Sequence, residues 1–237
     1  MCHGRDIGRY EVRSRDRRIL YVDESINLEN YPGTKQWLLQ FKAALDKRNE
    51  GKKDTISWSQ LHRPRVKSEL DIKEKILIQN TRNESLPVRI CAALDDQSVY
   101  GSQGINFVIP RNKANLRFLL AVLNSKLINY LFATKFLNLA IKAEYVKQVK
   151  LPKATKEEQQ KLADLAEAMI EAKKSFALAQ HDEKKCSRAD CMPTKPMSEA
   201  DKKLLEQRIA LIDSQINAAV YKLYGLTETE IKVVEGK

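Results

Sequence analysis

Short apolar runs rich in β-branched residues recur through residues 1–110. Each run is four or five residues long and is bounded by polar or turn-forming residues, a pattern typical of strands. The predicted strands are Tyr10–Ser14, Ile19–Val22, Lys75–Gln79, Val88–Ala92 and Ile105–Ile109. Together they predict one small mixed sheet.

One helix interrupts these strands. After a Tyr-Pro-Gly turn at residues 31–33, Thr34 is placed to cap a helix in which apolar side chains recur at spacings of three and four. These side chains are Trp37, Leu38, Phe41, Ala44 and Leu45. We expect this tryptophan face to pack on the sheet.

Three polar stretches lack a hydrophobic period and predict surface loops: Arg48–Asp54, Thr81–Leu86 and Asp95–Gly104. Loops carried by a rigid sheet are where recognition residues usually lie. From Asn112 onward the apolar spacing becomes helical, which predicts an amphipathic helical element. Its apolar positions are Leu116, Leu119, Leu120, Leu123, Leu127, Leu131 and Phe132.

Two capping patterns open long helices in the last third of the chain. Thr155 with Glu158 forms a capping box before a helix over residues 156–180, and Ser198 precedes a second helix over residues 199–224. A polar loop from His181 to Met197 joins them, which favours an antiparallel helical hairpin. The hairpin is either a free-standing coiled coil or an amphipathic pair packed on the sheet domain. Gly225 is placed to end the second helix, and a short terminal helix begins after Thr227.

These elements predict the α+β class. A small mixed β-sheet recognition domain with packed helices occupies residues 1–153, and the helical hairpin with its short terminal helix occupies residues 154–237.

The formal net charge of +11 is distributed unevenly. Residues 111–153 hold nine Lys or Arg and one acid, Glu144, so they carry +8, whereas residues 1–110 carry +4 and residues 154–237 carry −1. A cationic surplus confined to one segment indicates a surface that faces a polyanion. Nucleic acid is therefore the leading partner.

No apolar run approaches the ~18 residues of a membrane span, and the first twenty residues are too charged for a signal peptide. We expect a cytoplasmic protein with no membrane partner. Cys2, Cys91, Cys186 and Cys191 are then expected to be reduced thiols. His181 with the last two cysteines lacks the paired spacing of zinc ligands, so no metal site is predicted.

No catalytic constellation is found. Glycine-rich phosphate loops and nucleophile elbows are missing, and without a Pro-Pro pair the Asn/Asp-Pro-Pro-aromatic motif of amino-group DNA methyltransferases is missing too. Asp71 and Glu74 only loosely resemble the metal-binding carboxylates of nucleases. Ion pairs with neighbouring basic residues on the surface explain their presence better. We therefore assign no catalytic residue and no cofactor to this chain.

A series of strings in order resembles the TaqI-like C-terminal specificity domain, the target recognition part of many adenine-N6 DNA methyltransferases and type IIG restriction-modification enzymes. The strings are GRDIGRY at residues 4–10, NLENYPGTKQWLLQFKAALDKR, WSQLHRPR, KEKILIQN, FVIPRN, LLAVLNSKLINYLF, EYVKQVKLPKATKEEQQKLADL and YKLYGLTETEIKVVEG. LNSKL followed by LP and EEQ is also similar to the specificity subunits of type I restriction systems.

The resemblance implies a sequence-specific module that holds double-stranded DNA against a methyltransferase catalytic domain or subunit. That catalytic part, with S-adenosylmethionine as its cofactor, would precede Met1 in a complete enzyme. The chain is then either an excised C-terminal domain or a separate gene product.

Phosphate contacts would supply affinity, and a few side chains would read base edges in the major groove. The phosphate-binding candidates are Lys113, Arg117, Lys126, Lys135, Lys142, Lys147 and Lys150. The base-reading candidates are Arg63, Arg65, Asn80, Arg82, Asn83, Tyr100, Ser102 and Gln103. Arg5 and Arg9 either contact the DNA backbone near the catalytic half or lie in an interdomain interface.

Three other functions remain open at this point. The hairpin heptads would suit an assembly protein that forms a homodimer, with an incidental positive face. The chain would also suit a stand-alone specificity subunit of a type I-like restriction system. The third alternative, a nuclease or methyltransferase in its own right, lacks the motifs that it needs.

Overall fold

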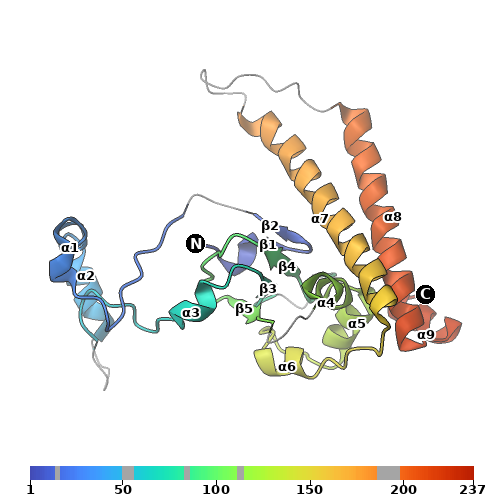
Figure 1. Ribbon diagram of the computed structural model, residues 1–237, viewed down its shortest axis with the longest axis horizontal. Coiled ribbons are helices and arrows are strands. Elements are labelled where there is room, and N and C mark those ends of the chain that lie inside the picture. Colours follow the sequence, from blue (N-terminus) through green and yellow to red (C-terminus); the bar gives the residue numbers. More distant parts are fainter. Residues whose placement is uncertain (14–16, 50–55, 83–85, 111–114, 186–197) are drawn as a thin grey trace.

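A three-stranded antiparallel sheet lies at the centre of the computed structural model, which describes residues 1–13, 17–49, 56–82, 86–110, 115–185 and 198–237. Its strands are β3 (Lys75–Gln79), β4 (Ala92–Asp95) and β5 (Ile105–Val108), in the order β4-β3-β5. A two-stranded antiparallel sheet, β1 (Ile7–Gly8) and β2 (Glu11–Val12), lies beside them (Figure 1). The predicted α+β class is confirmed, but the prediction of one mixed sheet is wrong, because the described strands form two separate sheets whose pairs are all antiparallel.

Alternation along β3 divides the interior between two faces of the sheet. Ile76 and Ile78 face the main core, which the helices cover, whereas Leu77 faces a smaller cluster with Ile7 and Ile105. All five side chains are almost completely buried. A strand buried on both faces reads as a continuous apolar run, as KILIQ does.

Two short helices cover the main face of the sheet. α4 (Leu116–Leu123) and α5 (Lys126–Thr134) are bent by 54° where they meet. The side chains of Asn115 and Ser125 cap their N-termini. The helical element expected here is therefore present, although its beginning at Asn112 lies outside the described residues.

The long helices are α7 (Lys156–Lys185) and α8 (Glu199–Tyr224), followed by α9 (Glu228–Glu235). The capping box of Thr155 and the cap of Ser198 form as the sequence predicts, and Gly225 ends α8 with a φ of 68°. α8 has the predicted bounds, and α7 extends five residues past the predicted end at residue 180.

Only part of the hairpin's length packs on the sheet domain. α7 rests on α4, and α8 packs against α7 and also contacts α5 (Figure 1). Met169 of α7 and Ile216 of α8 belong to the same core as the sheet and α4. This core is therefore continuous across residue 153, where the sequence suggested a division.

Expectations for residues 17–49 are wrong in two respects. The helix is broken into α1 (Pro32–Leu39) and α2 (Lys42–Asp46), and α1 begins at Pro32 instead of after Thr34, since proline suits the first helical position. Trp37 and Phe41, 52% and 45% exposed, do not pack on the sheet. Instead Val22, Leu28 and Leu38 form a separate small cluster, bordered by the short 3-10 helices η2 (Leu28–Asn30) and η3 (Lys47–Asn49).

Four of the five predicted strands differ from the observed ones, the last only because it ends at Val108 and not at Ile109. Residues 19–22 form no strand, because Val22 packs in the small cluster and its carbonyl accepts a hydrogen bond from Leu61. Val88–Ala92 is replaced by Ala92–Asp95: the Arg89 amide donates to the Asn129 side chain, and the Asn124 side chain bonds both backbone groups of Ala92, where β4 begins. In the first hairpin β2 is confined to Glu11–Val12, and Ser14 lies outside the described residues.

Candidate nucleic-acid interface

Two loops meet where β3 ends and β5 begins. The Asn80 amide donates to the Gly104 carbonyl at 2.9 Å, and the Ile105 amide donates to the Ser102 carbonyl at 3.2 Å. A 3-10 helix, η1 (Gly4–Asp6), approaches so closely that a Cβ on Gly4 would lie 2.7 Å from the Gly104 carbonyl oxygen. This close approach places Arg5 next to the loop that holds Gln103.

The basic segment joins the same end of the sheet. The Ile141 amide donates to the Asn80 carbonyl at 2.5 Å, and the Arg82 amide donates to the Leu139 carbonyl at 3.1 Å. An antiparallel bridge pairs Thr81 with Ala140 between these bonds. We call residues 79–82, 101–104 and 138–142 the sheet-end surface. It brings Asn80, Arg82, Ser102, Gln103 and Lys142 together, although they are scattered in the sequence.

A buried arginine holds this surface together. Arg89 is 3% exposed and donates to the Arg82 carbonyl at 2.9 Å and the Asn138 carbonyl at 2.7 Å. A longer bond of 3.4 Å reaches the Phe136 carbonyl. Three carbonyls satisfy the guanidinium, and the described residues provide no carboxylate partner for it. The sequence analysis missed this residue, although a charged side chain inside the apolar run VRICA was a usable signal.

Several base-reading candidates already have partners within the protein. Arg82 donates from Nε to the Val88 carbonyl and from Nη1 to Gln79 Oε1, both at 2.7 Å. Arg65 donates to the Ile105 carbonyl at 2.7 Å and lies 4.7 Å above the centre of the Phe107 ring. Burial lowers the pKa of this guanidinium from its usual value. These arginines shape the surface and keep only part of their donors for a ligand.

Tyr100 is also engaged. Its hydroxyl donates to Asp71, and this bond raises the pKa of the tyrosine. The pKa of Asp71 is lowered, first by Lys67, which lies 2.8 Å away, and then by Tyr100. Asp71 lies just after α3 (Lys67–Leu70), so this bond engages the Tyr100 hydroxyl within the protein, although Tyr100 directly precedes the sheet-end surface.

The other base-reading candidates have freer side chains. Arg63 and Gln103 are exposed, and their side chains make no described hydrogen bond. Ser102 is half-buried, and the amide oxygen of Asn80 is buried without a described partner. Asn83 lies outside the described residues, so the interface description omits it.

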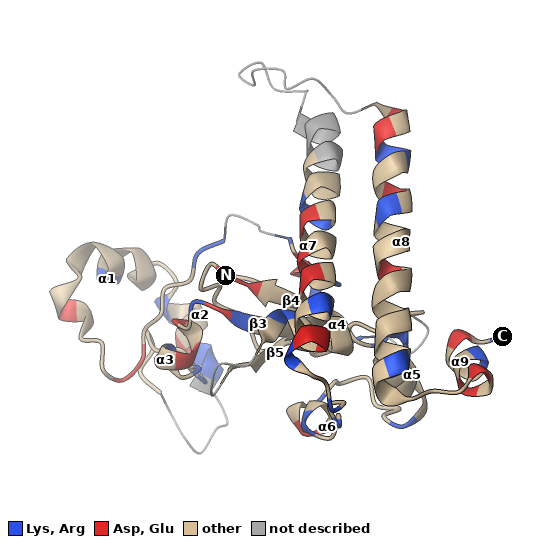
Figure 2. Cartoon of the chain, turned by 45° about the vertical axis from the view of Figure 1, so that its right-hand side comes forward, with Lys and Arg blue, Asp and Glu red and all other residues tan. Residues whose placement is uncertain are grey.

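The phosphate-binding candidates divide into two groups. Arg117 pairs with Glu167 and with Glu74, and Lys126 lies 3.4 Å from Glu235. Lys135, Lys142, Lys147 and Lys150 are exposed and form no ion pair with a described residue; we call these four the lysine surface. Lys113 lies outside the described residues. In the cartoon of Figure 2, blue Lys and Arg positions lie on and beside α6 (Ala143–Lys147).

Two stacked aromatic rings support the lysine surface. Phe136 and Tyr145 lie 4.5 Å apart with an interplanar angle of 14°. The ammonium of Lys135 is 5.4 Å from the centre of the first ring, and that of Lys142 is 5.8 Å from the centre of the second. The stack restricts the loop that carries both lysines, so they are held near the sheet-end surface.

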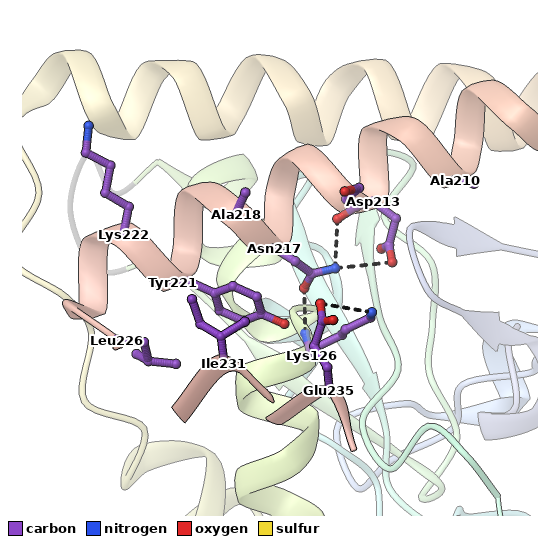
Figure 3. Close-up of a pocket in the computed structure, with 11 residues that line it drawn as sticks. Lys126, Ala210, Asp213, Asn217, Ala218, Tyr221, Lys222, Leu226, Ile231 and Glu235 are labelled. Atoms are coloured by element: carbon purple, nitrogen blue, oxygen red, sulfur yellow. Dashed lines mark hydrogen bonds and ion pairs between the residues drawn. The ribbon is translucent and has the colours of Figure 1, made fainter. Parts of the chain in front are cut away.

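Lys126 belongs to a different region. It lines a cavity of about 600 Å³ between α5, α8 and α9, drawn in Figure 3. Its amide donates to Asn217 Oδ1 at 2.7 Å, and Asn217 donates back to the Asp213 carbonyl at 2.7 Å. These bonds anchor α8 to the start of α5. Lys126 is therefore separate from the lysine surface.

The described ranges contain no group of three or more His, Cys, Asp or Glu that could hold a metal ion. Cys186 and Cys191, whose spacing already argued against a zinc site, lie outside those ranges, and the side chain of His181 is not described either. Within the same ranges no single helix is long and apolar enough to cross a membrane, and only the bent pair α4–α5 reaches that length and composition jointly.

Comparisons with known proteins agree on one relationship. The type II methyltransferase M.BstVI of Geobacillus stearothermophilus is 26% identical over 215 residues, which cover 89% of this chain. The chain spans 30% of the length of that relative. The structure of the type IIL restriction-modification enzyme MmeI in complex with DNA matches with a TM-score of 0.57 and 14% identity, over 90% of this chain and 27% of that one. At this identity the likeness concerns the fold.

The family model of the TaqI-like C-terminal specificity domain matches residues 1–152. This range contains the sheet, the sheet-end surface and the lysine surface. The chain therefore belongs to the family of TaqI-like C-terminal specificity domains.

Proposed function

We propose that this chain is the double-stranded DNA recognition module of a restriction-modification adenine-specific DNA methyltransferase. One observation carries the proposal: the sheet-end surface gathers candidate base-reading side chains from separate loops beside four lysines that form no ion pair with a described residue. Membership of the specificity-domain family supports it. So do the methyltransferase relative and the fold shared with an enzyme solved in complex with DNA.

The lysine surface and the sheet-end surface have different roles in recognition. The lysine surface contacts phosphates, which supplies affinity and fixes the register without reading sequence. Gln103 presents an amide group, which pairs well with adenine, and arginine pairs well with guanine. The protein thereby holds the duplex so that an adenine, flipped from the stack, enters a catalytic site outside this chain.

Methyl transfer belongs to the catalytic domain or subunit, with S-adenosylmethionine as its cofactor. The same surfaces would serve an excised domain, a separate gene product or a stand-alone type I-like specificity subunit. Such systems act on DNA inside the cell, so we infer a cytoplasmic location.

A salt titration of duplex binding tests the proposal. Fluorescence anisotropy with a labelled duplex should show affinity falling tenfold or more between about 50 and 200 mM salt, as expected for several phosphate contacts. Replacing Lys142 and Lys147 with glutamine should flatten this dependence. Binding that is absent at low salt, or that does not respond to salt, would exclude a DNA-binding module.

The hairpin supports a second proposal, a homodimer. Leu178, Leu204 and Leu211 are 68%, 64% and 60% exposed on α7 and α8, and exposed leucines of this kind often mark a protein interface. Light scattering of the wild type and of a variant with Leu204 and Leu211 changed to aspartate tests it. A monomeric wild type would refute dimerisation and leave DNA recognition untouched.

A further inference from the structure

A cavity of about 690 Å³ lies between the β1–β2 hairpin and the two long helices. Residues of β1 and β2 form one wall, residues of α7 and α8 form another, and Gln79 and Arg82 close the end nearest the sheet. Figure 1 shows β2 beside α7, and the two elements are in contact. Because Arg82 lines the cavity and also belongs to the sheet-end surface, the two regions adjoin.

Basic side chains from four parts of the chain converge on this cavity. They are Arg5, Arg9, Arg13, Arg82 and Lys173, against the acids Glu11, Glu206 and Asp213. The lining therefore carries a net positive charge, although α7 and α8 belong to the part of the sequence whose net charge is −1.

Two of these cations are neutralised within the protein. Arg9 lies 2.5 Å from Asp213 and also donates to the Asn124 carbonyl, so it ties the β1–β2 turn to α8. Arg13 lies 3.3 Å from Glu11. Arg5, Arg82 and Lys173 have no carboxylate partner among the described residues.

Apolar side chains complete the walls. Met169, Phe176 and Ile209 line the cavity from the two long helices. Like charges around a concave surface with low-dielectric walls focus a positive potential there, and an anion relieves their repulsion. A phosphate diester offers the single charge and multiple oxygen acceptors that guanidinium and ammonium groups bind.

We propose that this cavity binds a backbone phosphate of duplex DNA, with Arg5 and Lys173 as the binding groups and Arg82 at its edge. This inference rests on the proposed function, because the duplex must already lie on the sheet-end surface. It gives α7 of the hairpin a direct contact with DNA, and it extends the DNA path beyond the basic segment of the sequence.

The test compares two charge-matched double variants of the full chain. Arg5→Gln with Lys173→Gln removes the two cavity cations, and Lys161→Gln with Lys203→Gln removes two exposed lysines of α7 and α8 outside the lining. Each lost phosphate contact should make the negative slope of log K against log salt less steep by about 0.9. It should also weaken binding roughly five- to tenfold near 0.1 M salt. The cavity variant should lose both contacts, and the control variant should bind like the wild type.

The outcomes separate this inference from the proposed function. If the wild type binds DNA and the two variants bind alike, the cavity proposal is wrong and the recognition module stands. If the wild type does not bind duplex DNA, both fail. Added inorganic phosphate, compared with chloride at equal ionic strength, gives a further arm. If it raises the Tm of the wild type and of the control variant but not that of the cavity variant, while both variants bind DNA equally, the cavity holds free phosphate, which also overturns the proposal.

Discussion

Replacing Arg89 with methionine removes the side chain that joins residues 79–82 to residues 138–142 of the sheet-end surface. The wild-type guanidinium makes two hydrogen bonds of 2.9 and 2.7 Å and a longer one of 3.4 Å, all to backbone carbonyls. Hydrogen bonds from a charged donor contribute about 1.5–3 kcal/mol each, and the long one counts for less. Removing a buried charge regains part of its desolvation cost, so the net loss should be about 2–4 kcal/mol.

A lysine at this position should recover only part of the loss. Its ammonium is a compact point charge and cannot span the Arg82 and Asn138 carbonyls as the planar guanidinium does. We expect Arg89→Lys to lose roughly half as much stability as the methionine variant. In both variants the amides of Arg82 and Ile141, which join the two segments, should exchange with solvent faster than in the wild type.

Urea unfolding followed by circular dichroism measures these differences, and hydrogen exchange locates them. Arg63→Met is the matched control, because Arg63 is exposed and makes no described hydrogen bond. It should change the free energy of unfolding by no more than about 0.5 kcal/mol. If Arg89→Met is as mild as this control, the buried guanidinium does not organise the surface and the reasoning is refuted.

Four further predictions follow from single contacts. Lys75→Met should cost about 3–5 kcal/mol in urea unfolding, because it leaves Asp95 buried and unpaired, whereas Lys67→Met at an exposed pair should cost under about 1 kcal/mol. Gly101→Ala should cost about 1–3 kcal/mol by the same measurement, since its Cβ would lie 2.8 Å from the Phe107 ring, whereas Gly33→Ala meets no atom within 4 Å and should be neutral or stabilising. The thiols of Cys2 and Cys91 should resist a thiol reagent at about pH 8 until the protein unfolds, because burial raises the pKa of Cys2 to about 11 and also raises that of Cys91; rapid native labelling of either would contradict this. In DNA binding, Lys147→Gln should make the negative slope of log K against log salt less steep by about 0.9. Arg117→Gln should change this slope less, because Arg117 already pairs with two glutamates.

Local signals made the helical hairpin predictable from the sequence. The capping box at Thr155, the cap at Ser198 and the glycine after α8 each act within a few residues of the chain. Their outcome therefore depends little on distant contacts. The heptad pattern fixed which helix faces are buried, and the sheet domain then supplied the surface that covers them.

Tertiary contacts decided the features that the sequence did not predict. Trp37 and Phe41 share a helical face in the sequence, but the break between α1 and α2 and the separate cluster around Leu38 leave both rings exposed. Near the start of the predicted fourth strand, the Arg89 amide donates to the side chain of Asn129, and Asn124 bonds the backbone of Ala92, where the observed strand begins. Neither asparagine carries a local sign of this role.

The candidate interface was predicted as a region, and its individual side chains were not. Arg82 lies in a predicted surface loop and Arg65 was a base-reading candidate, yet each guanidinium already donates to a backbone carbonyl. A side-chain type does not reveal whether its donors are already used, because carbonyls from distant segments accept them. We therefore propose that base reading rests on Gln103, Arg63 and the donors that Arg82 retains.

Net charge along the sequence and charge available to DNA are different quantities. In the basic segment Arg117 and Lys126 pair with the acids at positions 74, 167 and 235, whereas Lys173 belongs to a segment of negative net charge and has no carboxylate partner among the described residues. Ion pairs in the folded chain thus make two cations of the basic segment less available to phosphates, whereas α7 contributes a cation that the distribution of charge along the sequence did not indicate. Because the salt slope counts only cations that neutralise phosphates, it should follow the structural assignment and not the sequence count.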